Sequence, residues 1–378
     1  MAPVKEPMRP DFQLLIKPAS ADCNQACGYC FYRRVGKVYP KTAEHRMTSQ
    51  VLDALVRRYL ALRLPHTVFC WQGGEPTLAG LAFYREAVAL MQAHGRGGQS
   101  VTNALQTNGL LLDAEWCRFL SQYRFLVGVS LDGPADLHDH YRGQGTHDRV
   151  LRAIRCMAEN HVEFNALAVV NDLTARHAGR IYRYFRELGI QYMQFIPCVE
   201  SDAAGKAEPY SVTAEAYGDF LCELFDCWLP DARSGVSARL FDALLAHAVT
   251  GRSGLCYLDH GCGNYFVVEY NGDAYPCDFF VDESWRLGNV LTTPFETLYE
   301  RGRAREFRAL RHRLPADCES CPWKDLCRGG CLKDRARIGG QYGGVSYFCK
   351  AYRRLFAHAA GPIRALAAEV RAAHPSQA

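Results

Sequence analysis

Residues 12–30 read FQLLIKPASADCNQACGYC, a short apolar run followed by a polar loop that contains three cysteines. The apolar part, residues 12–16, has the length of a buried strand and is too short for a helix. Cys23, Cys27 and Cys30 lie in the loop after it. Five more runs of this kind predict strands at residues 67–71, 101–105, 125–130, 163–170 and 192–196.

Helical segments are expected between these strands. Apolar residues recur at helical spacing over residues 51–60 and again over residues 150–157. The alternation of strand and helix over about six units predicts an α/β fold, an open or partial (β/α)6 barrel. The reactive groups of such a barrel lie at the carboxyl ends of its strands. Polar motifs directly follow predicted strands at residues 72–76, 106–109 and 130–134.

The alternation ends after the sixth strand. Asn271 and Gly272 stand between two apolar runs, residues 265–270 and 274–280, and this pattern predicts a β-hairpin. The rest of the C-terminal region is rich in loops and cysteines. We therefore predict two domains, a barrel at residues 10–234 and a cysteine-rich domain with a C-terminal helix at residues 235–378.

Composition excludes several classes of protein. Of 378 residues, 48% are hydrophobic and 22% are charged, which excludes disordered, collagen and coiled-coil chains. No apolar run approaches the roughly 20 residues of a membrane-spanning helix. The N-terminus is polar and lacks the apolar part of a signal peptide, so we expect a cytoplasmic protein. The 44 basic and 40 acidic residues are dispersed, which predicts neither nucleic acid nor a membrane surface as a partner.

The chain has 17 cysteines and no secretory signal, a combination that favours metal or redox chemistry over disulfides. Eleven of them form patterned groups, at Cys23, Cys27, Cys30, Cys256, Cys262, Cys277, Cys318, Cys321, Cys327, Cys331 and Cys349. A structural zinc site takes four ligands, so eleven thiolates divide into two complete sets and an incomplete set of three. Most of the other six are expected to be buried as small hydrophobic side chains: Cys70, Cys117, Cys156, Cys198, Cys222 and Cys227.

Two kinds of metal site fit these cysteines. Three thiolates on a [4Fe–4S] cluster leave one iron open to an external ligand. The alternative for the early three is a zinc site completed by a distant histidine, although the 13 histidines form no metal-binding motif. The alternative for the C-terminal group is a pair of zinc ribbons. Such ribbons usually show Cys-x2-Cys twice, whereas only Cys318 and Cys321 show it there.

The early motif, Cys-x3-Cys-x-Tyr-Cys at residues 23–30, resembles the signature of the radical S-adenosylmethionine (SAM) enzymes. This resemblance implies that SAM binds the open iron and is cleaved to a 5′-deoxyadenosyl radical. The seven-cysteine pattern from Cys262 to Cys349 resembles the SPASM extension, which carries two auxiliary [4Fe–4S] clusters. The implied cofactors are therefore three [4Fe–4S] clusters and SAM.

Within that superfamily the sequence resembles the anaerobic sulfatase-maturating enzymes, which convert a cysteine or serine of a sulfatase to Cα-formylglycine. The likeness is carried by residues 15–20, 72–80, 174–177, 194–196 and 275–279. It implies a sulfatase polypeptide with a Cys/Ser-x-Pro-x-Arg segment as substrate. It also implies an electron donor such as flavodoxin or ferredoxin.

The same resemblance assigns roles to particular residues. One auxiliary cluster would be held by Cys256, Cys262, Cys277 and Cys331, and the other by Cys318, Cys321, Cys327 and Cys349. The contacts to SAM would come from Tyr29, Gly74, Ser130, Arg142 and Val199, the last at a position where the family can carry leucine. Considered alone, Gly74 permits close backbone approach to a ligand. Arg142 offers a planar fork to a carboxylate.

Asp278 directly follows the predicted ligand Cys277, so its Cα lies about 3.8 Å from that of the cysteine. Oxidation of a thiol or hydroxyl carbon to an aldehyde removes two electrons and two protons. We predict that the radical takes a hydrogen atom from Cβ, that Asp278 takes the proton of the heteroatom, and that the auxiliary clusters accept an electron. The alternative role for Asp278 is to cap the end of the hairpin.

Two other functions stay open at this point. A SPASM peptide maturase of the same architecture would form a thioether or carbon cross-link in a ribosomal peptide, and it would not need Asp278. A protein that is not an enzyme would be a zinc-stabilised binding module or an electron carrier.

Overall fold

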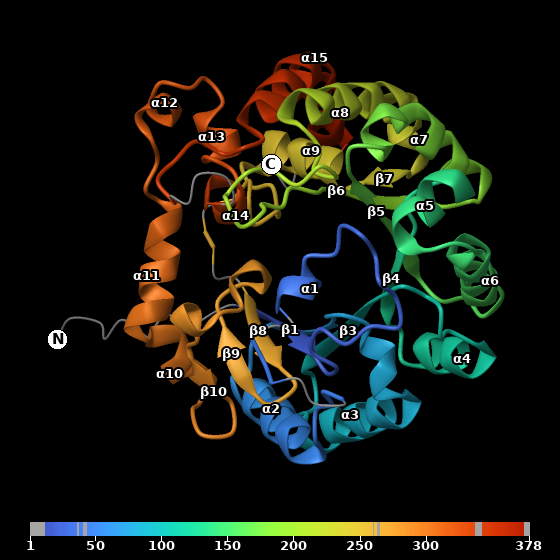
Figure 1. Cartoon of the computed structure of the whole chain (residues 1–378), viewed down its shortest axis with the longest axis vertical. Helices are drawn as coiled ribbons and strands as arrows, with labels where there is room; N and C mark the ends of the chain where they lie inside the picture. Colours follow the sequence, from blue (N-terminus) through green and yellow to red (C-terminus); the bar gives the residue numbers. More distant parts are fainter. Residues whose placement is uncertain are drawn as a thin grey trace.

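The computed structural model describes residues 12–35, 38–40, 44–259, 261–262, 265–336 and 342–373. Its strands form a ten-stranded sheet in the order β10-β9-β8-β1-β2-β3-β4-β5-β6-β7 (Figure 1). The strands are β1 (Gln13–Lys17), β2 (His66–Trp71), β3 (Ser100–Thr107), β4 (Leu126–Ser130), β5 (Phe164–Val170), β6 (Tyr192–Pro197), β7 (Ser237–Ala238), β8 (Tyr265–Glu269), β9 (Asp273–Tyr275) and β10 (Gly288–Asn289).

Most helices lie around the outside of this sheet, whereas the short α1 lies near the centre of the view (Figure 1). In the first part of the chain they are α1 (Tyr32–Val35), α2 (Ser49–Ala61), α3 (Leu81–His94), α4 (Ala114–Gln122), α5 (Ala135–Arg142), α6 (Thr146–Glu159) and α7 (Ala178–Glu187). The later ones are α8 (Ala214–Trp228), α9 (Arg239–Thr250), α10 (Phe295–Glu300), α11 (Gly302–Arg311), α12 (Ala316–Glu319), α13 (Lys324–Cys327), α14 (Leu332–Ala336) and α15 (Cys349–Ala373).

The six strands predicted from the apolar runs are confirmed as β1 to β6, and they pair in parallel. The two predicted helical segments lie within α2 and α6. Helix α2 begins where the Thr48 hydroxyl accepts a hydrogen bond from the backbone N–H of Val51. Its buried side, which includes Leu52 and Leu55, packs into the main hydrophobic core. The predicted α/β class is therefore confirmed, with a parallel sheet and outer helices.

The predicted hairpin is confirmed as β8 and β9, which pair antiparallel around Gly272, a residue with φ +87°. Strand β8 also pairs in parallel with β1, so the hairpin extends the barrel sheet. At the other edge β7 pairs in parallel with β6. We propose a domain division at 234/235, and strands from both sides of it share one sheet. Strand β8 covers the edge of β1 and strand β7 covers the edge of β6, two edges that would otherwise be unpaired.

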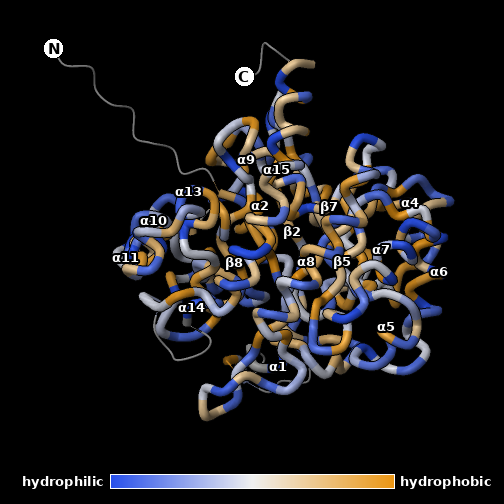
Figure 2. The backbone as a smooth tube through the Cα atoms, turned by 90° about the horizontal axis from the view of Figure 1, so that it is seen from above, coloured by the Kyte–Doolittle hydropathy of each residue, from blue (hydrophilic) through white to orange (hydrophobic). Residues whose placement is uncertain are grey.

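The C-terminal helix α15 packs against α8 and α9, and its buried residues include Tyr352 and Phe356. Figure 2 shows hydrophobic stretches gathered around β2, β5 and β8, whereas hydrophilic stretches are frequent in outer helices such as α4 and α6. Among the residues that the structure describes, no helix is both long enough and apolar enough to cross a membrane.

The prediction that most of the six remaining cysteines are buried is wrong. Only Cys117 and Cys198 are buried, and the other four are partly exposed. Two of those four, Cys222 and Cys227, lie on α8 beside the buried stripe that includes Leu221 and Leu224. Helical geometry rotates them away from the centre of that stripe.

Candidate active site

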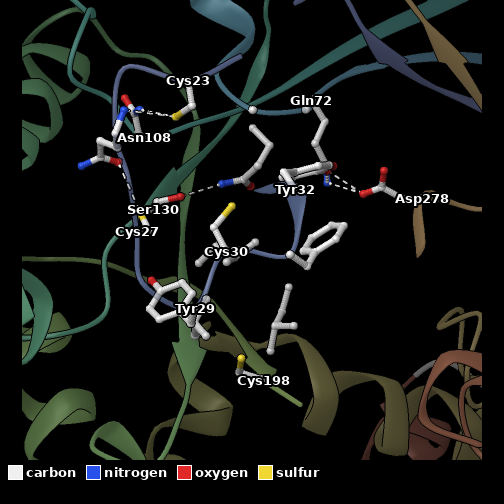
Figure 3. A pocket seen from close by; sticks show the side chains of 18 of the residues that line it. Cys23, Cys27, Tyr29, Cys30, Tyr32, Gln72, Asn108, Ser130, Cys198 and Asp278 are labelled. Carbon is white, nitrogen blue, oxygen red and sulfur yellow. Dashed lines mark hydrogen bonds between the residues drawn. The ribbon is translucent and has the colours of Figure 1, made fainter. Parts of the chain in front are cut away.

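A cavity of about 220 Å³ opens at the carboxyl ends of the parallel strands (Figure 3). It is lined by the nine residues that the sequence assigned to the first cluster, to SAM and to the base: Cys23, Cys27, Cys30, Tyr29, Gly74, Ser130, Arg142, Val199 and Asp278. These residues come from six separate stretches of the chain, so the fold brings them together at the edge where a barrel carries its chemistry.

The three early cysteines line the cavity from the loop that follows β1. Burial raises the pKa of Cys23 to about 11, and it also raises the pKa of Cys27 and of Cys30. Thiolates in such a position need a cation beside them, and a bound metal supplies it. Soft sulfur donors on a half-enclosed cavity are therefore a suitable donor set for an iron–sulfur cluster.

Glycine is required where the next loop meets the cysteine loop. The backbone N–H of Gly74 donates to the Ser20 carbonyl at 2.8 Å. A Cβ on Gly74 would lie 2.1 Å from the Asp22 carbonyl oxygen, and one on Gly73 would lie 2.5 Å from that of Ser20. The glycines therefore allow the backbones of two loops to touch, in addition to any approach to a ligand.

The fork of the Arg142 guanidinium already contacts a carboxylate of this chain, that of Asp132. Its Nε and Nη2 donate to the Asp132 carboxylate at 2.8 and 3.0 Å, and the Tyr29 hydroxyl donates to Asp132 at 2.5 Å. Burial disfavours the charge of Asp132, but the Arg142 guanidinium outweighs it and holds the pKa of that carboxyl below its ordinary value. Asp132 lies in the polar motif after β4, and no sequence pattern marks it as the partner of Arg142.

Asp278 begins a short 3-10 helix (Asp278–Phe280) and is only 4% exposed. One carboxylate oxygen lies 2.6 Å from Lys17 Nζ. The other accepts hydrogen bonds from the Tyr32 hydroxyl at 2.6 Å and from the Gln72 amide at 3.4 Å (Figure 3). The predicted base therefore lies on the cavity wall with partners from three other segments.

Lys17 is fully buried at the end of β1, opposite Glu269 in the register of β1 and β8. Its Nζ lies 3.3 Å from a Glu269 carboxylate oxygen. Burial lowers the pKa of Lys17, but Asp278 and Glu269 outweigh it and the net shift is upward. Burial raises the pKa of Glu269. Sequence reasoning missed Lys17 and Glu269. The one signal that the sequence carries for them is that each is a charged residue at the end of an apolar run.

The two C-terminal cysteine sets are also assembled. Cys318, Cys321, Cys327 and Cys349 line one cavity of about 290 Å³. In the other set, the cysteines are near enough for their charges to interact. Cys256 and Cys262 contribute to the raised pKa of Cys277, and Cys256 and Cys277 contribute to that of Cys331. Within the described part of the chain, no three His, Cys, Asp or Glu side chains are placed to hold a metal ion directly. A four-iron cube separates its thiolates further than a single ion does.

Comparison with known proteins matches residues 18–185 to the Radical SAM superfamily and residues 256–322 to the SPASM iron-sulfur cluster-binding domain. A cysteine-type anaerobic sulfatase-maturating enzyme of Clostridium perfringens is 39% identical over 93% of this chain and 96% of the relative. A serine-type anaerobic sulfatase-maturating enzyme of Bacteroides thetaiotaomicron is 34% identical over 95% of this chain and 91% of the relative.

Solved structures of related proteins also match this chain. A structure described as native anSMEcpe with bound AdoMet and Cp18Cys peptide matches with a TM-score of 0.88 and 38% identity, over 95% of this chain and 99% of that one. Streptococcus suis SuiB, at 15% identity and a TM-score of 0.64, shares the fold. The chain is a radical SAM enzyme, and it belongs to the family of anaerobic sulfatase-maturating enzymes.

Proposed function

We propose that this enzyme converts a cysteine or serine of a sulfatase polypeptide to Cα-formylglycine in the cavity of about 220 Å³. The observation that carries the proposal is the position of Asp278, a buried carboxylate on the same cavity wall as Cys23, Cys27 and Cys30. The relatives are named as enzymes of this activity, of both the cysteine and the serine type.

Three cysteines would hold the first [4Fe–4S] cluster, and Tyr29, Gly74, Ser130, Arg142 and Val199 would contact SAM. When bound, SAM on its cluster supplies the 5′-deoxyadenosyl radical that takes one hydrogen atom from the substrate Cβ. Two donor groups of Arg142, Nε and Nη2, already bind Asp132. Arg142 would therefore contact SAM from a position that Asp132 holds. The eight C-terminal cysteines would hold two auxiliary [4Fe–4S] clusters, as the match to a SPASM domain favours.

Asp278 would accept the proton of the substrate thiol or hydroxyl. The second electron would leave through the cluster held by Cys277, the residue next to the base in the chain. Together these steps remove two electrons and two protons from the substrate. A serine gives the aldehyde directly, whereas a cysteine gives a thioaldehyde that water converts to the aldehyde with release of sulfide.

The proposed substrate segment is an extended Cys/Ser-x-Pro-x-Arg peptide, and the proposed electron donor is a flavodoxin or a ferredoxin. A cytoplasmic location stays a prediction. The alternative of a thioether- or carbon-linking maturase is not favoured by the relatives, because the similarity to SuiB supports the fold alone.

The test is anaerobic incubation of the reduced, cluster-loaded enzyme with SAM and a Cys-x-Pro-x-Arg peptide. We expect 5′-deoxyadenosine and a peptide aldehyde, detected by mass spectrometry and by capture with a hydrazine. A matched peptide with alanine in place of the cysteine is the control. A peptide that loses only two hydrogens and forms an internal thioether would instead identify a cross-linking enzyme.

A further inference from the structure

Two arginines are buried between the two C-terminal cysteine sets. Arg311, at the end of α11, and Arg335, on α14, are each 2% exposed. Among the described residues neither side chain forms an ion pair with a carboxylate. All the hydrogen bonds that their guanidinium groups donate go to backbone carbonyl oxygens.

Both guanidinium groups converge on one short turn, residues 328–330. Arg311 Nη1 donates to the carbonyls of Arg328 and Gly330, the latter at 2.6 Å. Arg335 Nη2 donates to the Arg328 carbonyl at 2.8 Å, and its Nε donates to the Gly329 carbonyl at 2.8 Å. Every carbonyl of the turn therefore faces a buried cation.

This turn joins the two proposed clusters. Cys327, immediately before it, belongs to one ligand set, and Cys331, immediately after it, belongs to the other. All three residues of the turn are left-handed, with φ of 50°, 78° and 69°. A Cβ on Gly329 would lie 2.3 Å from Arg335 Nη2, so the backbone can wrap the guanidinium only if glycine stands there.

Arg311 also reaches the loop of another predicted ligand. Its Nη2 donates to the Tyr257 carbonyl at 2.9 Å, next to Cys256, while its Nε has no hydrogen-bond partner among the described residues. The Arg311 and Arg335 cations together thus contact chain segments that carry ligands of both clusters.

Burying two cations side by side without an anion is costly. Burial and the repulsion of Arg311 lower the pKa of Arg335. Cysteine side chains are among the groups that interact with these cations: Cys262, Cys318 and Cys331 act on Arg335, and Arg311 acts on Cys256, Cys262 and Cys327. Cysteines of both sets therefore surround this pair of cations.

We propose that Arg311 and Arg335 are positioning residues for both auxiliary clusters: they clamp the turn between Cys327 and Cys331 and hold the counter-charge that raises the reduction potential of each cluster. The inference rests on the proposed function only for the presence of those clusters. Hydrogen bonds, nearby charge and burial are the means by which a protein sets such a potential.

The test uses the full chain with Cys23, Cys27 and Cys30 changed to alanine, so that only auxiliary clusters contribute. Iron and sulfide are counted, and the clusters are titrated by electron paramagnetic resonance at controlled potentials. In this background Arg335→Gln removes the buried charge and Arg335→Lys keeps it. Arg305→Gln removes an exposed charge from α11 and is the matched control.

We expect about eight irons per chain before further change, as two four-iron clusters require. With Arg335→Gln we expect the ratio of reduced to oxidised cluster at a fixed potential to fall about tenfold, which is a shift of about 59 mV for one electron. Arg335→Lys and Arg305→Gln should leave the potentials near their starting values. If Arg335→Gln loses iron and Arg335→Lys retains it, the positive charge at this position is needed by the clusters, which also supports the inference.

Two results would overturn the inference. One is unchanged potentials and full iron in Arg335→Gln. The other is equal loss of iron in Arg335→Gln and Arg335→Lys, because the charge would then be without effect. Absence of auxiliary iron from the parent chain would instead refute the cofactor set of the proposed function.

Discussion

The ammonium of Lys17 lies 2.6 Å from the Asp278 carboxylate at the wall of the cavity that forms the candidate active site, with the lysine fully buried. The same ammonium lies 3.3 Å from Glu269, which is also fully buried. Lys17, on the first strand of the barrel, therefore holds the proposed base in place. Glu269, on the hairpin strand β8, holds Lys17 in the same way. Barrel and hairpin meet at this point.

Asp278→Asn should abolish formylglycine formation. A positioned general base contributes about 10²- to 10⁴-fold to a rate, so we expect product formation to fall at least about 100-fold. The fold should survive, because Glu269 still pairs with Lys17. Rates are measured by mass spectrometry of the peptide, with iron content as a check. Glu283→Gln, at a side chain that is 83% exposed, is the control. Undiminished formation of the aldehyde would exclude Asp278 as the base.

Lys17→Met should destabilise the fold. It would leave the Asp278 and Glu269 carboxylates buried without their cation, and breaking a buried ion pair on one side costs about 3–5 kcal/mol. Urea unfolding under anaerobic conditions measures the loss, and adding Glu269→Gln should recover part of it. Lys350→Met is the control, because its pair with Glu215 is 79% and 63% exposed and is screened by solvent, so its loss should leave the stability nearly unchanged. Equal losses in both lysine variants would contradict this assignment.

Asp132→Asn should weaken the binding of SAM. The change leaves the Arg142 guanidinium buried beside a neutral amide that has one acceptor oxygen instead of two, so Arg142 and Tyr29 are held less firmly at the proposed SAM site. We expect the dissociation constant for SAM, measured by equilibrium dialysis, to rise at least about tenfold, which corresponds to about 1.4 kcal/mol. Asp136→Asn on α5 breaks an exposed pair with Arg180 and should leave SAM affinity unchanged. If the two variants bind SAM alike, Asp132 does not organise the site.

Much of the fold could be predicted from local patterns. The six long strands are visible because each is a run of apolar residues, and the hairpin is visible because Asn271 and Gly272 favour its turn. Strands β7 and β10 were missed because each has two residues, too few to show a period. The pairing of β8 with β1 was missed because it joins segments that lie far apart in the sequence, which periodicity does not report.

The site divides in the same way. The eleven patterned cysteines could be grouped because their spacing along the chain carries that signal, and Asp278 was proposed as the base from its place beside Cys277 and the family resemblance. Lys17, Glu269 and Asp132 could not be found, because each is a buried charge whose partner is brought to it by the fold. The contact of Arg142 with SAM stays a prediction, and nothing in the sequence marks Asp132 as a second partner for its guanidinium.

Gly74→Ala should remove the first cluster without unfolding the protein. The new Cβ would lie 2.1 Å from the Asp22 carbonyl oxygen and 2.5 Å from that of Ala21, and backbone at that distance must move. The Asp22 carbonyl precedes Cys23 and accepts a hydrogen bond at 2.7 Å from the N–H of Glu75, so the movement passes directly to the cysteine loop.

We expect Gly74→Ala to lose about four irons per chain, the content of one cluster, and all production of 5′-deoxyadenosine. The auxiliary sites lie on other segments and should keep their iron. Gly97→Ala introduces the same methyl group at a position with no neighbouring atom within 4 Å and should retain full iron and activity. Iron analysis and assay of SAM cleavage distinguish the two. A Gly74→Ala enzyme with undiminished iron would show that the cysteine loop can move away from the new side chain and still bind its cluster.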